Sequence, residues 1–279
     1  MKVVVTGAKG LLGAYVVREL QGDGFDVTAA DRSAADVTSL GDVRSLFART
    51  SPDAVIHCAA WTDVDGCEGD PDRAFRVNAL GTRNVAQGAD ERGAHLVYLS
   101  TEQVFDGTSG RPYGEFDRPN PLSVYGASKA QGEWYATHLC QRVTVVRSSW
   151  LFGGGAASPA SAVVEQARRL GEVAAVEDQV GCPTYVGHLA SLVRRVVAGE
   201  VLGIIHAAGG GRCTGVEFAR RILELRGLGD TPVTAVRAAE LGRAAPRPAS
   251  AVLGQRQLRL EGLDPLPHWH AGLAAWLAE

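Results

Sequence analysis

Three side chains in the first half of the chain have the types and spacing needed to move a proton. Tyr125 and Lys129 are four residues apart in a segment with a helical pattern, so both lie on one helix face. A nearby ammonium stabilises a phenolate and lowers the tyrosine pKa toward the neutral range. The pair alone is common by chance in helices. Thr101, a hydroxyl at the end of a predicted strand, completes a Thr–Tyr–Lys constellation, so we predict Thr101, Tyr125 and Lys129 as catalytic residues.

A glycine-rich turn lies between the first predicted strand and the first predicted helix. Glycines let a backbone approach a pyrophosphate closely, and the unpaired N–H groups of a helix N-terminus bind it. The spacing is GxxGxxG rather than the usual GxGxxG, but the position directly after VVVTG favours a dinucleotide site over a plain turn. The predicted contacts in this turn are Gly7, Lys9, Gly10, Leu11, Leu12 and Gly13.

The second predicted strand ends in a mixture of charges. Asp31 stands where an acid usually meets the adenosine ribose, which favours NAD. Lys9 and Arg32 lie beside it and suit a 2′-phosphate, which favours NADP, so NADP(H) is expected and NAD(H) stays open. The other predicted cofactor contacts are Asp36 and Val37 at the adenine, Ala59 and Ala60 at the end of the third strand, and Tyr125 and Lys129.

Apolar runs that alternate with helical patterns must position these groups. The predicted strands are residues 3–5, 27–30, 54–60, 95–100 and 143–148, with a returning strand near 202–207. The predicted helices start at Leu11 and cover 71–91, 122–139, 160–170, 186–198 and 214–226. Continuous apolar strands separated by helices predict an α/β fold with a doubly wound parallel sheet, the Rossmann arrangement. We expect residues 1–148 and the returning strand to bind the dinucleotide. Residues 149–279 should mainly form a smaller, discontinuous C-terminal substrate lobe.

Composition excludes several other classes of protein. The 279 residues are 46% hydrophobic and 21% charged, in the range of a folded domain. A formal net charge of -3 gives no field that would attract nucleic acid or an anionic membrane. The five cysteines form no CxxC pair, so we expect free thiols and no metal site. The first apolar stretch is too short for a signal peptide, which favours a cytoplasmic protein.

The Thr–Tyr–Lys constellation resembles the short-chain dehydrogenase/reductase superfamily, in the extended branch that acts on nucleotide sugars. The resemblance implies that Thr101 hydrogen-bonds the substrate oxygen, Tyr125 is the general acid and Lys129 tunes it. The segment after Thr101 reads Glu102-Gln103. Dehydratases of this branch carry Asp-Glu there and use both for elimination. Gln103 cannot serve as a base, so a dehydratase mechanism is disfavoured.

Further segments are similar to the dTDP-4-dehydrorhamnose reductase family. Its patterns STDYVFDG, AAYTxVD, VNA, RTSWVYG, DQxGxPT and RPxxSxL match residues 100–107, 59–65, 77–79, 147–153, 178–184 and 247–253 in the same order. The resemblance implies that Val64 and Trp150 wall the deoxyhexose and that Gln103 lies in the sugar pocket. It also implies that Gln179, Thr184 and Arg247 lie near the nucleotide, where a guanidinium suits a diphosphate.

This family resemblance implies NAD(P)H-dependent reduction of the C4 keto group of a dTDP-4-keto-6-deoxyhexose. Gln103 replaces the family's tyrosine and Glu102 its aspartate, so a modified deoxysugar fits as readily as the rhamnose precursor. The expected partners are this dTDP-linked sugar and a second copy of the chain in a homodimer. Some family members bind magnesium through acidic residues at a dimer contact. Tyr15 stands at one matching position here, so that metal is not expected.

Two other functions are compatible with parts of the pattern. One is a nucleotide-sugar epimerase of the same branch, which would hold NAD tightly. The other is a non-catalytic NADP-binding protein, similar to the regulatory subunits of methionine adenosyltransferase that belong to this family. The intact set of Thr101, Tyr125 and Lys129 argues against the non-catalytic alternative.

Overall fold

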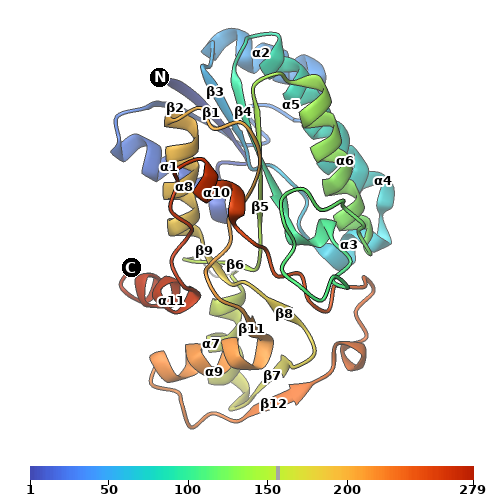
Figure 1. The fold of residues 1–279 in the computed structure, drawn as a ribbon, viewed down its shortest axis with the longest axis vertical. Coiled ribbons are helices and arrows are strands. Elements are labelled where there is room, and N and C mark those ends of the chain that lie inside the picture. The colour runs from blue at the N-terminus through green and yellow to red at the C-terminus, as the bar shows by residue number, and fades with distance from the viewer. Residues whose placement is uncertain (155–157) are drawn as a thin grey trace.

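The computed structural model describes residues 1–154 and 158–279. Within them, the central sheet has six strands in the order β10-β5-β4-β3-β1-β2 (Figure 1), and every neighbouring pair is parallel. The strands are β1 (Lys2–Thr6), β2 (Asp26–Ala30), β3 (Ala54–His57), β4 (His95–Thr101), β5 (Val143–Ser148) and β10 (Gly203–His206). The predicted doubly wound sheet is confirmed, and so is the returning strand, which pairs with β5.

Helices cover both faces of the sheet, which explains why its strands are almost continuously apolar. Successive side chains of a strand point to opposite faces. Val3 and Val5 accordingly pack in the core cluster that contains residues of α1 (Leu11–Gly22) and α8 (Val186–Ala198). Val4 packs in the other cluster, against the second layer of helices. That layer is α2 (Leu40–Thr50), α5 (Gly81–Asp90) and α6 (Val124–Leu139).

The structure corrects two of the predicted elements. The helix expected over 71–91 begins as predicted at Pro71, with Asp70 accepting from the Arg73 backbone N–H at 3.0 Å, but it contains a π-helical turn. It is divided into α4 (Pro71–Ala74), η1 (Phe75–Leu80) and α5. The strand expected over 54–60 ends at His57, because the chain then turns to pass directly against Gly7.

A smaller lobe stands at one end of the sheet, in the lower part of Figure 1. Its elements are α7 (Pro159–Leu170), α9 (Gly215–Leu225) and three two-stranded sheets, β7 (Val173–Val176) with β12 (Val233–Val236), β8 (Val180–Gly181) with β11 (Cys213–Thr214), and β6 (Leu151–Phe152) with β9 (Thr184–Tyr185). Helix α8 and strand β10 lie between these segments in the sequence and pack with the central sheet. The second half of the chain therefore contributes elements both to the smaller lobe and to the layers of the central sheet.

The remaining elements are short helices. They are α3 (Val64–Gly69), η2 (Glu102–Val104), η3 (Ala238–Leu241), α10 (Arg256–Leu260) and α11 (Trp269–Leu277). In the part of the chain that the structure describes, no helix combines the length and the apolar character that a membrane span requires.

Candidate active site

A cavity of about 550 Å³ opens at the carboxyl ends of β1, β2 and β3. This is the edge at which open parallel sheets bind their ligands. The predicted cofactor residues that line it are Gly7, Lys9, Gly10, Asp31, Arg32, Asp36, Val37, Ala59 and Ala60. Tyr125, Lys129, Leu11, Leu12 and Gly13 are not among its lining residues. The structure thus brings together most of the residues that the sequence assigned to the dinucleotide.

The glycine turn has a geometry that only glycines allow. Gly7 has a φ of +68°, and a Cβ there would stand 2.6 Å from the Ala59 nitrogen. A Cβ on Gly13 would stand 2.2 Å from the Gly7 carbonyl oxygen. Gly10 is the N-cap of α1 and provides no side-chain cap, so the N–H groups that follow it stay free for an anion. Leu11 and Leu12 would contribute these backbone groups rather than their side chains.

The charges at the end of β2 neutralise one another in pairs. The Lys9 ammonium contacts the Asp31 carboxylate and lowers the Asp31 pKa below its usual value, with help from Ser33. Arg32 Nε lies 3.2 Å from Asp36 Oδ2. The acid that favours NAD and the cations that favour NADP are therefore held together at the cavity mouth. This geometry fits either coenzyme.

Sequence reasoning missed three large side chains that line the same cavity, namely Trp61, Arg73 and Arg76. The Arg73 guanidinium lies 4.1 Å from the centre of the Trp61 ring, a cation–π contact. The signals were present in the sequence. Trp61 follows the third strand directly, and the two arginines are three residues apart near the start of a helix. They add positive charge to a cavity that fits the phosphates of a dinucleotide.

The three predicted catalytic residues lie near the end of β4. Ser123 caps α6 by accepting the Gly126 backbone N–H at 3.1 Å, which places Tyr125 in the first turn of the helix. Tyr125 is buried and hydrogen-bonds Thr101. Lys129, one turn further along α6, is also buried. The structure thus assembles all three predicted catalytic residues.

The expected effect of Lys129 on the Tyr125 pKa is wrong in this geometry. Burial raises the Tyr125 pKa above its ordinary value, and the ionised form of Glu102 raises it further, while the hydrogen bond with Thr101 lowers it. The Lys129 ammonium donates to the Leu99 carbonyl oxygen at 2.7 Å instead. Burial lowers the Lys129 pKa to about 7. Desolvation therefore outweighs the attraction that the sequence suggested, and Tyr125 is held as a phenol.

The three predicted sugar-pocket residues have different surroundings. Val64 packs against a small cluster that contains Tyr125. The Gln103 backbone N–H donates to Thr101 Oγ1 at 3.2 Å, and the buried Gln103 Oε1 has no hydrogen-bond partner among residues 1–154 and 158–279. Trp150 has a positive φ of 42°, and its ring lies against Gly181, where a Cβ would be 2.3 Å from it. Trp150 is half-buried, so it is not simply part of the core.

The three residues predicted near the nucleotide behave differently. Thr184 is fully buried, and its hydroxyl donates to the Cys182 carbonyl at 3.0 Å and accepts from Gly209 N at 2.9 Å. The Thr184 hydroxyl is occupied within the protein, and the position of Thr184 near the nucleotide stays a prediction. Arg247 forms a two-pronged ion pair with Asp65, at 3.0 and 2.7 Å. Gln179 is half-buried just before β8.

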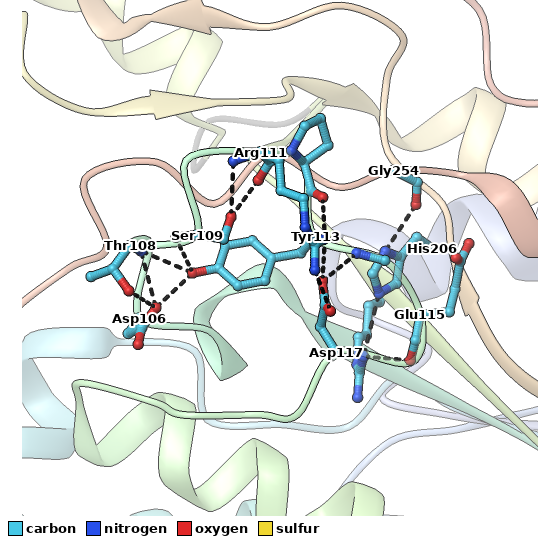
Figure 2. A network of polar contacts seen from close by, with 12 residues as sticks. Asp106, Thr108, Ser109, Arg111, Tyr113, Glu115, Asp117, His206 and Gly254 are labelled. Atoms are coloured by element: carbon cyan, nitrogen blue, oxygen red, sulfur yellow. Dashed lines mark hydrogen bonds and ion pairs between the residues drawn. The ribbon is translucent and has the colours of Figure 1, made fainter.

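The loop that follows Gln103 is fixed by its own polar network, shown in Figure 2. The Tyr113 hydroxyl donates to Asp106 Oδ1 at 2.6 Å and accepts from Thr108 N at 2.9 Å. Arg111 pairs with both oxygens of Asp117, each at 2.8 Å. These contacts fix the conformation of the loop between η2 and α6.

A nucleotide cradle beside a Thr–Tyr–Lys group on a doubly wound sheet defines an oxidoreductase of the extended short-chain dehydrogenase/reductase class. The family model described as "RmlD substrate binding domain" matches residues 1–279. The chain belongs to the dTDP-4-dehydrorhamnose reductase family.

Individual relatives agree over nearly their full length. The chain is 36% identical to the spore coat polysaccharide biosynthesis protein SpsK of Bacillus subtilis, over 100% of this chain and 97% of that protein. It is 37% identical to a dTDP-4-dehydrorhamnose reductase of Mycobacterium tuberculosis, over 99% and 92%. The structure of the Bacillus anthracis dTDP-4-dehydrorhamnose reductase in complex with NADP superposes with a TM-score of 0.97 at 35% identity, covering 99% of this chain and 98% of that one.

Proposed function

We propose that this protein reduces the C4 keto group of a dTDP-linked 4-keto-6-deoxyhexose, with NADP(H) as its coenzyme. The observation that carries the proposal is the assembly of Thr101, Tyr125 and Lys129 beside the glycine-lined cavity. Relatives that carry the name of this reduction, and the NADP in the Bacillus anthracis complex, support the substrate class and the coenzyme.

Different residues of the chain would bind the coenzyme and transfer the proton. The glycine turn would hold the pyrophosphate with its backbone, and Lys9 and Arg32 would face the adenosine end. When bound, the nicotinamide supplies the hydride. Tyr125 gives its phenol proton to the oxygen at C4, and its raised pKa keeps that proton in place until the oxygen becomes more basic. Thr101 donates a hydrogen bond to the same oxygen.

Tyr125→Phe tests this assignment. Loss of a general acid should lower kcat by about 10²- to 10⁴-fold, with NADPH binding retained. Tyr113→Phe is the matched control, because Tyr113 is equally buried but its hydroxyl serves only the loop of Figure 2. Turnover is followed by NADPH oxidation with a dTDP-4-keto-6-deoxy sugar. Unchanged turnover in Tyr125→Phe contradicts the proposal.

The sugar itself is a finer part of the proposal. Gln103 stands where the family has a tyrosine, and its buried amide oxygen has no hydrogen-bond partner in the described part of the chain, so a sugar hydroxyl can satisfy it. We expect a substrate that differs from the rhamnose precursor in its ring substituents. A panel of dTDP-4-keto-6-deoxy sugars that differ at C2, C3 and C5 tests this, with NADPH and NADH compared on each. Equal kcat/KM across the panel contradicts selection by Gln103.

A further inference from the structure

Glu102 is a buried carboxyl that the proton-transfer scheme above does not use. It follows Thr101 directly and is 5% exposed. Thr101 Oγ1 lies 2.9 Å from Glu102 Oε2 and also accepts the Gln103 N–H at 3.2 Å. Thr101 in turn hydrogen-bonds Tyr125. Glu102 therefore contacts the Thr101 hydroxyl, and Thr101 contacts the proposed general acid, Tyr125.

The hydrogen-bond capacity of Thr101 makes the charge of Glu102 decisive. A threonine hydroxyl has one proton to donate and two lone pairs to accept with. A carboxylate accepts only, so an ionised Glu102 holds the single Thr101 proton. A neutral carboxylic acid can donate to Thr101 Oγ1. Together with the Gln103 N–H it then fills both lone pairs, and the Thr101 proton is free to point at Tyr125 and the substrate oxygen.

The surroundings of Glu102 favour the neutral form. Burial raises its pKa to about 7, against the hydrogen bond from Thr101, which lowers it. The titratable groups that face it are Tyr125 on α6 and Cys182 between β8 and β9. Both are neutral at pH 7, since burial raises their pKa values as well. Among the described residues, no lysine or arginine contributes to the shift of Glu102.

We propose that Glu102 is a positioning residue that works as a neutral acid, donating to Thr101 Oγ1 and so directing the Thr101 proton toward Tyr125 and the substrate oxygen. This rests on the proposed reduction. It assigns a role to a residue that differs from the aspartate of the family pattern by one methylene group. The ionised form of Glu102 would withdraw the Thr101 proton and lower kcat rather than raise KM, because the hydrogen bond strengthens as charge develops on the oxygen.

Glu102→Gln tests the proposal through pH. The amide mimics the neutral acid at every pH, so the ratio of its kcat to that of the wild type should be near one at pH 6. It should reach about tenfold at pH 8 and about a hundredfold at pH 9. Lys129 also titrates near neutral pH, but it is present in both proteins and cancels in the ratio. A flat ratio, or a change in KM alone, overturns the proposal.

Glu115→Gln is the matched control, because Glu115 is as buried as Glu102 but accepts from Gln257 N and lies outside the Thr101 network. The ratio of the kcat of Glu115→Gln to that of the wild type should not change with pH. A second measurement needs no turnover. The infrared band of the neutral Glu102 acid, isolated by subtraction of Glu102→Gln, should vanish as pH rises through about 7. Its midpoint should move upward in Thr101→Val, which removes the hydrogen bond that lowers the Glu102 pKa.

These two measurements separate the failure of this inference from failure of the proposed reduction. A wild-type protein that reduces none of the keto sugars contradicts the reduction, whatever the infrared band shows. A protein that turns over normally but has an ionised Glu102 at pH 6, or a Glu102 band indifferent to Thr101→Val, contradicts the positioning role.

Discussion

The two ends of the candidate site differ in how far their charges are removed from water. At the adenosine end, the side chains of Lys9 and Arg32 are 83% and 85% exposed. At the proton-transfer end, Glu102 and Lys129 are only 5% and 3% exposed. Water and salt screen the first pair of charges, whereas burial shifts the pKa values of the second. The same change of charge should therefore change stability and activity more at the buried end than at the exposed end.

A third region contains charges that are buried as a complete ion pair. Arg147 on β5 and Glu133 on α6 form a fully buried ion pair with N–O distances of 2.6 and 2.9 Å. Ser100 on β4 also donates to Glu133, at 2.6 Å. These contacts join β5 to β4, which carries Thr101, and to α6, which carries Tyr125. They thereby fix the relative positions of Thr101 and Tyr125.

The largest expected effect is at this buried pair. Glu133→Gln leaves the Arg147 charge buried without its counter-charge, and should lower the free energy of unfolding by about 3–5 kcal/mol. Glu200→Gln, which breaks the exposed ion pair with Arg142, should cost about 1 kcal/mol or less. Chemical denaturation of both variants measures the difference. Equal losses would show that burial does not separate the two kinds of pair.

The pH dependence of stability should also reveal the buried end. Glu102 has a folded pKa of about 7 against 4.5 for an unperturbed side chain, so the folded state keeps a proton that the unfolded state loses. Relative to Glu102→Gln, the wild type should be equally stable below pH 4.5, lose about 3 kcal/mol as pH rises to 7, and change little above. Denaturant titrations at several pH values measure this. A constant difference contradicts the buried neutral acid.

The glycine turn should respond through backbone strain rather than charge. Gly13→Ala places a methyl group against the Gly7 carbonyl oxygen, and the turn must shift, at a cost of about 1–3 kcal/mol. NADPH affinity should fall at least in proportion, about tenfold or more. Gly22→Ala in the same helix serves as the control, because no atom of the described residues would lie within 4 Å of its methyl group. Calorimetric titration with NADPH measures both. Unchanged affinity in Gly13→Ala would argue against a pyrophosphate at this turn.

The smallest expected effect is at the exposed end. Asp31→Asn frees Lys9 from its ion pair, so we expect a change of only a few-fold in the ratio of kcat/KM for NADPH and NADH, in favour of NADPH. The effect should shrink as salt is added, because these charges are exposed. A large change that is insensitive to salt would show that the adenosine end is buried when the coenzyme is bound.

Much of the fold could be predicted from the sequence, because local patterns carry it. The apolar run 143–148 and the periodic segment 186–198 have the same bounds in the structure as in the prediction. The error in the third strand lies where a tertiary contact decides the local structure, because the residues after His57 pass against Gly7. Helix α2 was not predicted, although it carries local signals. Ser39 caps it by accepting from Asp42 N, and Val43, Leu46 and Phe47 have helical spacing.

The candidate site divides in the same way. The Thr101, Tyr125 and Lys129 spacing is a property of one strand end and one helix, so the sequence was sufficient to find it. The positions of Trp61 and Arg73 were visible in the sequence, but the contact between them depends on two segments meeting in space. Thr184 was assigned to the nucleotide on resemblance, yet its hydroxyl is used between Cys182 and Gly209, which only the packing of the lobe could show.

The sequence by itself determined the class of protein, since glycine spacing and the Thr–Tyr–Lys set are local constraints on backbone and chemistry. The tertiary structure alone decided the protonation states. Lys129 donates to the Leu99 carbonyl, and Glu102 is buried next to Thr101. Burial raises the pKa of Tyr125, whereas the sequence predicted that it would be lowered. The physical reason is that a pKa depends on the water, charges and donors around a group, and these come from segments distant in the chain.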